Sequence, residues 1–213
     1  MDSTSTVQQT AALSQVAADI LQRRRIAGLA LVDQAEAIVL ACFDMAQRFH
    51  QRGKLIAFGN GGSSTDAQHI AVEFVHPVMV GKRALPAIAL TNDTATLTSL
   101  AQRHGWHDVF AYQLRYLAHP PQDIALAISQ DKPDQNILRG LGVAKQMGLL
   151  TIALTGGNSD VMATHITADH LLVSPDEEPQ IVKEMHVTVY HILWELVHVF
   201  FAHPGLLGPK EGP

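Results

Sequence analysis

Two side chains that can move protons or hold a metal ion lie four residues apart, at His69 and Glu73. If this segment is helical, that separation places both side chains on one face. An imidazole and a carboxylate so placed can act as an acid–base pair or as two ligands of a metal ion. The same spacing also suits an ordinary surface ion pair, so the spacing alone leaves all three roles open.

A glycine-rich turn precedes this segment and could approach an anion. It reads Gly59-Asn60-Gly61-Gly62-Ser63 and follows the apolar run Leu55–Phe58. Glycine lets the backbone come close to a ligand, and the free N–H groups at the start of a helix favour negative charge. The spacing fits neither a dinucleotide-binding fingerprint nor a P-loop. The turn therefore indicates either a phosphate or sugar contact or a simple change of chain direction.

Short apolar runs alternate with helical segments after Gly53, and they predict the elements that position these residues. The predicted strands are 55–58, 87–90, 124–128, 150–154 and 171–173, and the predicted helices are 64–76, 94–117, 134–147, 158–166 and 178–203. Strands that are apolar throughout are typical of a parallel sheet covered on both faces. The pattern predicts an α/β fold with a doubly wound sheet, in which ligands bind beyond the carboxyl ends of the strands.

Two helices are predicted ahead of the first strand. Apolar residues recur at three- and four-residue spacing in the first, which predicts a buried face made of Ala11, Leu13, Val16, Ala17, Ile20 and Leu21. Gly28 is expected to end this helix. We therefore expect one domain over residues 1–213, with a helical arm (1–52) that packs against another subunit, an α/β core (53–203) and a mobile tail (204–213).

Composition narrows the class of protein. The 213 residues carry 15 Lys+Arg against 20 Asp+Glu, a net charge of -5, which argues against a general nucleic-acid binder. The one cysteine, Cys42, excludes an intrachain disulfide and a cysteine-cluster zinc site. The first twenty-two residues lack Lys and Arg, and no unbroken apolar run reaches the roughly 18 residues of a membrane span. We expect a soluble, cytoplasmic protein without a secretory signal or membrane segment.

Several motifs together resemble the sugar isomerase (SIS) domain family. In chain order they are Gly59–Ser63, Asp66-Ala67-Gln68-His69 with Glu73, Leu85–Leu90 with Asp93-Thr94, Ala127-Ile128-Ser129, Ala153–Gly156, and Glu184-Met185-His186 leading to His191. The resemblance runs from about residue 10 to residue 200. It is closest to the branch that contains the phosphoheptose isomerases and the DnaA initiator-associating protein.

The resemblance implies a five-stranded parallel sheet, a homotetramer with active sites between subunits, and a particular reaction. Isomerases of this branch interconvert sedoheptulose 7-phosphate and D-glycero-D-manno-heptose 7-phosphate through an enediolate, which needs a base, an acid and a group that stabilises the oxyanion.

By the same resemblance, Glu73 is expected to be the catalytic base and His191 its acid–base partner, and His69, Glu73 and His191 are expected to hold zinc. The positions expected to contact the sugar or its phosphate are Asn60, Gly61, Gly62, Ser63, Asp93, Thr94, Ser129 and Lys183. Without the resemblance, His191 reads as a half-buried helix histidine facing Glu195.

The sequence departs from the family at two places. The loop after the third predicted strand, usually rich in Ser and Thr, here reads Ser129-Gln130-Asp131-Lys132-Pro133-Asp134-Gln135-Asn136. Its two carboxylates would repel a phosphate and its proline removes an N–H donor, so we expect weaker phosphate binding there.

The second departure is Lys183, where the family has a glutamine that binds zinc. An ammonium has no lone pair to donate. Either zinc is absent or held by three ligands, or Lys183 turns away from the zinc site. Alternatively, the ammonium replaces the metal and stabilises the enediolate or pairs with Glu73. An ordinary solvated lysine is a further alternative.

Three functions remain after these departures. The first is a sugar-phosphate isomerase of the phosphoheptose type, favoured because the expected acid–base pair is intact. The second is a non-catalytic SIS module that binds a sugar phosphate and regulates a protein partner. The third is a diverged isomerase for another, less phosphorylated sugar.

Overall fold

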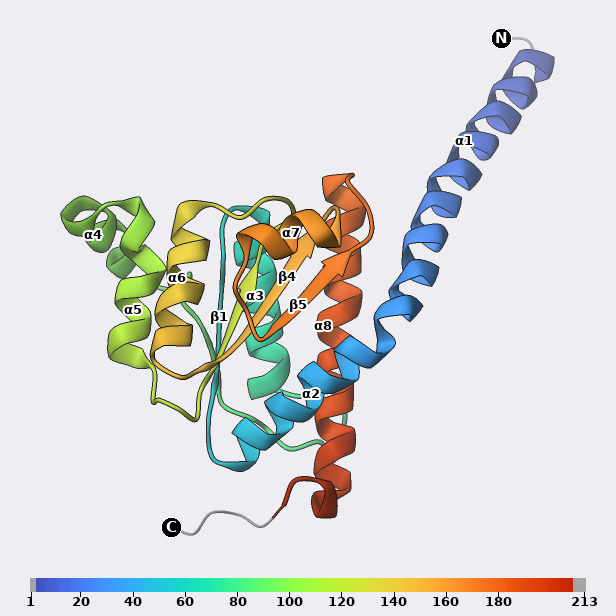
Figure 1. The fold of residues 1–213 in the computed structure, drawn as a ribbon. Coiled ribbons are helices and arrows are strands. Elements are labelled where there is room, and N and C mark those ends of the chain that lie inside the picture. Colours follow the sequence, from blue (N-terminus) through green and yellow to red (C-terminus); the bar gives the residue numbers. More distant parts are fainter. Residues whose placement is uncertain (1–2, 209–213) are drawn as a thin grey trace.

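A five-stranded parallel sheet lies at the centre of the computed structural model, which describes residues 3–208 (Figure 1). The strand order is β2-β1-β3-β4-β5. The strands are β1 (Leu55–Gly59), β2 (Ala87–Ala89), β3 (Ile124–Ile128), β4 (Leu150–Gly156) and β5 (His170–Ser174). All residues of β1, β3 and β4 are buried, as expected for strands that are apolar on both faces. The predicted α/β class and parallel sheet are confirmed.

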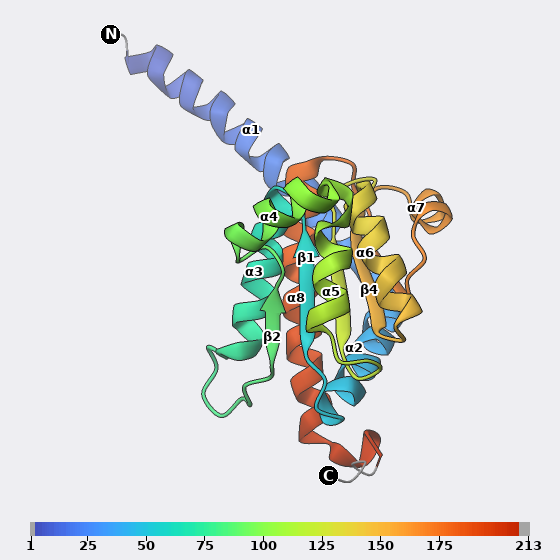
Figure 2. The same cartoon turned by 90° about the vertical axis from the view of Figure 1, so that its left-hand side faces the viewer.

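Helices cover both faces of the sheet, so the core has two halves (Figure 2). Helices α2 (Ala35–His50), α3 (Gly62–Val75) and α8 (Pro179–Ala202) pack on one face. On the other lie α4 (Thr94–His104), α5 (Val109–Leu117), α6 (Gln135–Gln146) and α7 (Ser159–His165). Alternate residues of each strand enter the two halves, so Leu55 and Ala57 face α3 and α8 whereas Ile56 and Phe58 face α5.

The winding of the sheet reverses between β1 and β3. The chain moves outward from β1 to the edge strand β2 and then returns to β3 on the other side of β1. In open α/β sheets, such a reversal leaves a crevice at the carboxyl ends of the two strands, where ligands bind. This crevice lies between the glycine turn after β1 and the loop that starts at Ser129.

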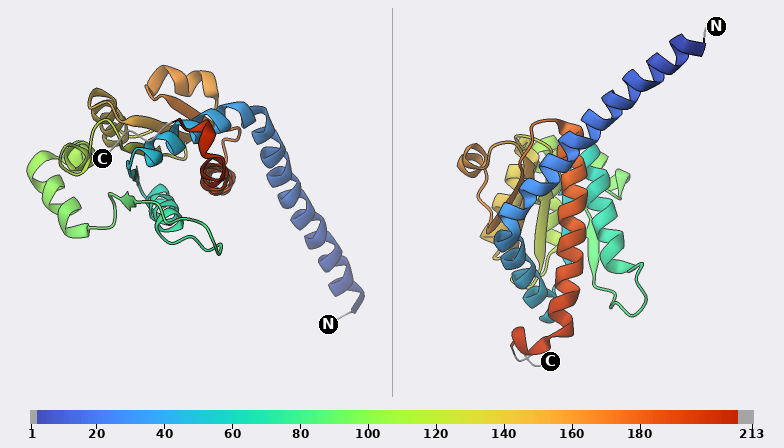
Figure 3. Two further views of the ribbon diagram at one scale, coloured as in Figure 1. Left: turned by 90° about the horizontal axis from the view of Figure 1, so that it is seen from below. Right: turned by 90° about the vertical axis from the view of Figure 1, so that its right-hand side faces the viewer.

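Helix α1 (Ser3–Ala30) extends away from the rest of the molecule (Figure 3). The predicted break at Gly28 is wrong, because the helix continues to Ala30 and a 3-10 helix, Leu31–Gln34, makes the bend. A helix tolerates one interior glycine at a cost of about 1 kcal/mol. The predicted buried face is also wrong for the single chain: Leu13, Val16 and Leu21 are 69%, 53% and 66% exposed.

Two further boundaries differ from the predictions. The predicted helix 94–117 is interrupted at Gly105, whose φ of +85° is a left-handed conformation that ends α4. A 3-10 helix, Trp106–Asp108, then leads into α5. The tail predicted at 204–213 forms a 3-10 helix over Pro204–Leu206, and residues 209–213 lie outside the described part of the chain.

Two helical spans are long and apolar enough to cross a membrane by length and composition, although no unbroken apolar run predicted one. They are Thr10–His50 and Pro179–Ala202. The second is α8, whose Tyr190, Leu193 and Val197 are fully buried against the sheet. The first consists of α1 and α2 with the 3-10 bend between them. The second span therefore belongs to the α/β core.

Candidate active site

The turn between β1 and α3 depends on two glycines. A Cβ atom at Gly59 would lie 2.7 Å from the carbonyl oxygen of Ile128, so β1 and β3 could not keep their spacing with a larger residue. Gly61 has a φ of +50°, which glycine adopts without strain, and it precedes the first residue of α3. The Ser63 N–H donates to the Asn60 carbonyl at 2.9 Å, and α3 begins here, two residues earlier than predicted. Ser63 is buried, whereas Gly61 and Gly62 are exposed.

The structure brings His69, Glu73 and His191 together, although His69 and His191 are 122 positions apart in the sequence. His69 and Glu73 lie one turn apart on α3, and His191 lies on α8. One ligand atom from each of the three lies within 4.8 Å of the other two. His69 Nε2 is 3.3 Å from Glu73 Oε1, and the two side chains are 42% and 15% exposed. The cluster therefore reaches solvent at His69 and His191.

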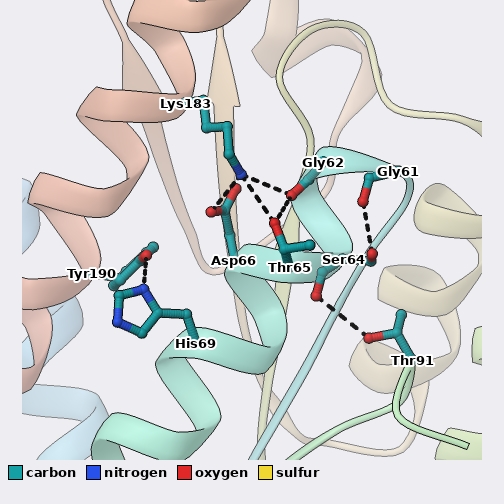
Figure 4. A network of polar contacts seen from close by, with 9 residues as sticks. All are labelled: Gly61, Gly62, Ser64, Thr65, Asp66, His69, Thr91, Lys183 and Tyr190. Atoms are coloured by element: carbon teal, nitrogen blue, oxygen red, sulfur yellow. Dashed lines mark hydrogen bonds and ion pairs between the residues drawn. The ribbon is translucent and has the colours of Figure 1, made fainter.

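Tyr190 contacts the cluster from its buried side. Its hydroxyl lies 2.6 Å from His69 Nδ1, and the residue is fully buried between α3 and α8 (Figure 4). Burial, together with the negative charges of Asp66 and Glu73, raises the pKa of the Tyr190 hydroxyl well above its ordinary value. The hydroxyl therefore stays protonated and can both donate and accept a hydrogen bond.

Trp194, one turn further along α8 than Tyr190, forms a hydrogen bond to the backbone of α3. Its indole N–H donates to the Glu73 carbonyl at 2.9 Å. Glu73 is therefore fixed to α8 through its main chain, and its carboxylate is left to face His69.

Lys183 turns towards the first turn of α3 (Figure 4). Its ammonium donates to Asp66 Oδ1 at 2.7 Å, to the Gly62 carbonyl at 2.8 Å and to Thr65 Oγ1 at 3.2 Å. These three acceptors use all three of its protons. Of the alternatives that the sequence left open, the turned-away lysine matches this geometry, whereas pairing with Glu73 and simple solvation do not.

His186 lies near the same ion pair and is nearly inaccessible to solvent. Its exposed fraction is 1%, and neither ring nitrogen meets hydrogen-bond geometry. Burial lowers the pKa of His186 and the nearby Lys183 adds to this, against the opposing effects of the Thr155 backbone and Asp66. The second carboxylate oxygen of Asp66 is also buried without a partner.

Asn60 bridges the crevice to the loop that departs from the family pattern. Its side-chain Nδ2 donates to Asp134 Oδ2 at 2.7 Å and to Asn136 Oδ1 at 2.8 Å, and Asn136 Nδ2 donates back at 2.9 Å. The Asp134 carboxylate thus lies just before α6 and holds an amide that was expected to contact the substrate. Ser129 is half-buried at the end of β3, and its N–H donates to the Leu154 carbonyl.

Asp93 and Thr94 lie apart from this cluster, at the start of α4. Asp93 caps the helix, accepting from the Thr96 N–H at 3.0 Å and the Thr96 hydroxyl at 2.6 Å. These hydrogen bonds hold the pKa of Asp93 below its usual range. Asp93 also borders a cavity of about 330 Å³ whose walls include Tyr112 and Leu100. Both Asp93 and Thr94 are exposed.

The donor set at His69, Glu73 and His191 fits zinc. Two imidazoles and one carboxylate are a common catalytic zinc site, in which the fourth position is left for water or substrate. No other group of three or more histidine, cysteine or acidic side chains with this proximity occurs among the described residues. Sequence reasoning did not predict the contacts of Tyr190 and Asp66 with this region. Asp66 stands in a motif that carries the resemblance, but no pattern relates it to Lys183, and both contacts depend on the packing of α3 on α8.

Comparisons with known proteins agree with this architecture. The SIS domain model matches residues 22–156. The phosphoheptose isomerase of Aquifex aeolicus is 40% identical over 163 residues, which cover 76% of this chain and 84% of that relative. Among solved structures, a phosphoheptose isomerase from Neisseria gonorrhoeae superposes with a TM-score of 0.78 at 29% identity, over 87% of this chain and 98% of that one. One from Francisella tularensis gives 0.80 at 27% identity, over 88% and 98%. This chain belongs to the SIS domain family, in the branch of the phosphoheptose isomerases.

Proposed function

We propose that this protein is an aldose–ketose isomerase that interconverts sedoheptulose 7-phosphate and D-glycero-D-manno-heptose 7-phosphate. The observation that carries the proposal is the convergence of His69, Glu73 and His191 at the surface between α3 and α8. The substrate is the one expected from the resemblance, and the relatives named phosphoheptose isomerase support it.

The reaction needs two proton transfers, one of which is assigned to Glu73 and the other to His191. Glu73 takes the proton from the carbon next to the carbonyl group, and it is partly buried, which suits a base. His191 moves the proton between the two substrate oxygens, and it is exposed at the surface where a substrate arrives. The glycine turn and the start of α3 orient the substrate through backbone N–H groups.

His69, Glu73 and His191 would also hold a zinc ion. The ion would stabilise the negative charge that develops on the substrate oxygens. The Lys183 ammonium is satisfied by Asp66 and by two oxygens of the α3 turn, so it leaves the fourth position open. Glu73 then serves as both ligand and base, as the resemblance implies.

We also propose that the protein assembles as a homotetramer in the cytoplasm. The apolar side chains exposed on α1 support this, because patches of this kind mark contacts with other chains. Helix α1 extends too far to be covered by its own α/β core (Figure 3). The proposal includes no binding of nucleic acid or of a membrane. A further protein partner would bind a surface other than the apolar side chains of α1.

A second candidate follows from the contacts of Asn60. Because Asp134 and Asn136 hold the Asn60 amide, a phosphate at this place would have to displace a carboxylate. That geometry favours an isomerase for a less phosphorylated sugar. It does not favour the other alternative from the sequence, a non-catalytic sugar-phosphate-binding module that regulates a partner. Substrate binding separates these candidates from the first.

The test is calorimetry of the purified protein with sedoheptulose 7-phosphate, with metal content measured on the same sample. Micromolar binding together with turnover supports the proposal, and the absence of both binding and zinc contradicts it. Glu73→Gln keeps the shape of the side chain and removes the base, so we expect kcat to fall by about 10²- to 10⁴-fold. Glu36→Gln, at an exposed position on α2, is the matched control and should leave kcat unchanged.

A further inference from the structure

Each ring nitrogen of His69 has its own partner. Nδ1 lies 2.6 Å from the Tyr190 hydroxyl, and Nε2 lies 3.3 Å from Glu73 Oε1. A neutral imidazole carries one proton, so one nitrogen donates and the other offers its lone pair. Which nitrogen can bind a metal is therefore decided by the partner of the other nitrogen.

The Tyr190 hydroxyl suits both arrangements. If the proton is on Nε2, that nitrogen donates to Glu73 while Tyr190 donates to Nδ1. If the proton is on Nδ1, it is donated to Tyr190, and the Nε2 lone pair faces the side of Glu73 and His191 where the donor atoms converge. A carboxylate or a backbone carbonyl in place of the hydroxyl could only accept, so it would permit only the second arrangement.

We propose that Tyr190 is a positioning residue that holds the His69 ring with Nδ1 at its hydroxyl, so that Nε2 faces the metal site. The proposal rests on the metal site of the proposed function. The ring of Tyr190 is fully buried and lies edge-on to both histidines, with centroids 5.4 Å from His69 and 5.0 Å from His191. Only its hydroxyl reaches the His69 nitrogen, so removing one oxygen atom isolates the effect.

The test is the zinc affinity of Tyr190→Phe, measured by competition with a chromogenic chelator. We expect a 10- to 100-fold loss of affinity, the usual effect of removing such a partner from a metal-binding histidine. Tyr116→Phe, at a tyrosine that is 72% exposed on α5, should bind zinc as the unchanged chain does. In a His69→Gln background, Tyr190→Phe should cost no further affinity, because the histidine that it positions is gone.

Nitrogen-15 NMR of the zinc-loaded protein gives a second readout that needs no variant. We expect His69 to carry its proton on Nδ1; a proton on Nε2 overturns the inference. Unchanged zinc affinity in Tyr190→Phe overturns it as well, and so does an equal loss in the His69→Gln background. Zinc binding without isomerase activity would contradict the proposed reaction and leave this inference intact, whereas no zinc binding by the unchanged chain contradicts both.

Discussion

At the scale of single residues, the pairing of Lys183 with Asp66 brings charge into the interface of α3 and α8. The two side chains are 35% and 4% exposed. An ion pair with one buried member is costly to break, because the remaining charge loses its partner while it stays out of water. Asp66 already has one buried oxygen without a partner, so it has no second contact that could replace the lysine.

Replacing Lys183 by glutamine should therefore destabilise the protein. We expect a loss of about 2 kcal/mol in the free energy of unfolding, the order of a charge-assisted hydrogen bond to a buried group. Urea denaturation measures it. Lys183→Gln combined with Asp66→Asn should recover most of the loss, since no charge is then left unpaired.

The matched control for this prediction is Lys145→Gln. Lys145 lies 3.3 Å from Asp169, but these side chains are 43% and 39% exposed, and exposed ion pairs contribute about 0–1 kcal/mol. Equal losses for Lys183→Gln and Lys145→Gln would contradict the special role of the buried carboxylate.

How far the site could be predicted differs from residue to residue. The four-residue spacing of His69 and Glu73 predicted a shared face, and the two side chains do lie on one face of α3. Their proximity to His191 came only from the family resemblance, because no local pattern relates residues so distant in the chain. The partners of Lys183 and His69 could not be predicted, since they depend on how α8 lies against α3.

At the scale of elements, the turn between β1 and α3 combines a close approach with an unusual backbone angle. Replacing Gly61 by alanine should cost about 1–3 kcal/mol of stability, because a Cβ atom is strained at a φ of +50° and a ψ of −121° although the space around it is open. Gly59→Ala should cost more, because its Cβ would lie 2.7 Å from the Ile128 carbonyl oxygen. Thermal or urea unfolding measures both losses.

Gly142 provides the control of opposite sign. It lies within α6 with open space around it, so Gly142→Ala should stabilise the protein by about 0.5–1 kcal/mol. Similar losses at all three glycines would mean that general chain flexibility, and not the geometry of the turn, sets the effect.

Helices and strands were predicted best where a local sequence pattern determines their bounds. Apolar runs bounded by polar residues placed each strand within a few residues of its observed limits. The division of 94–117 was missed because helical periodicity continues on both sides of Gly105, and the end of α4 depends on the backbone angle of that one residue. Gly28 misled in the opposite sense, because glycine also occurs inside helices.

At the scale of the whole molecule, stability should fall as the solution becomes mildly acidic. Burial lowers the pKa of His186 in the folded protein, so the folded state keeps this ring neutral. The unfolded chain takes up a proton below about pH 6.5, the ordinary pKa of histidine. Folding is therefore opposed as the pH drops below that value, by up to about 1.4 kcal/mol per pH unit for one proton.

The difference in unfolding free energy between pH 7.5 and pH 5.5 tests this. His186→Leu should flatten the dependence, whereas His76→Leu, at an exposed position after α3, should retain it. An unchanged slope in His186→Leu would assign the acid sensitivity to other groups.

Three side chains of α8 make polar contacts with α3, in the same order along both helices. Lys183 meets Asp66, Tyr190 meets His69, and Trp194 meets the Glu73 carbonyl. A slip of one helix by a single turn, about 5.4 Å, would misalign all three at once and carry His191 away from its neighbours. The register of α8 relative to α3, and not the conformation of a loop, therefore brings the cluster together. The loop between α3 and β2 could therefore change in length without altering the chemistry, whereas one residue inserted into α8 between Lys183 and Tyr190 would abolish it.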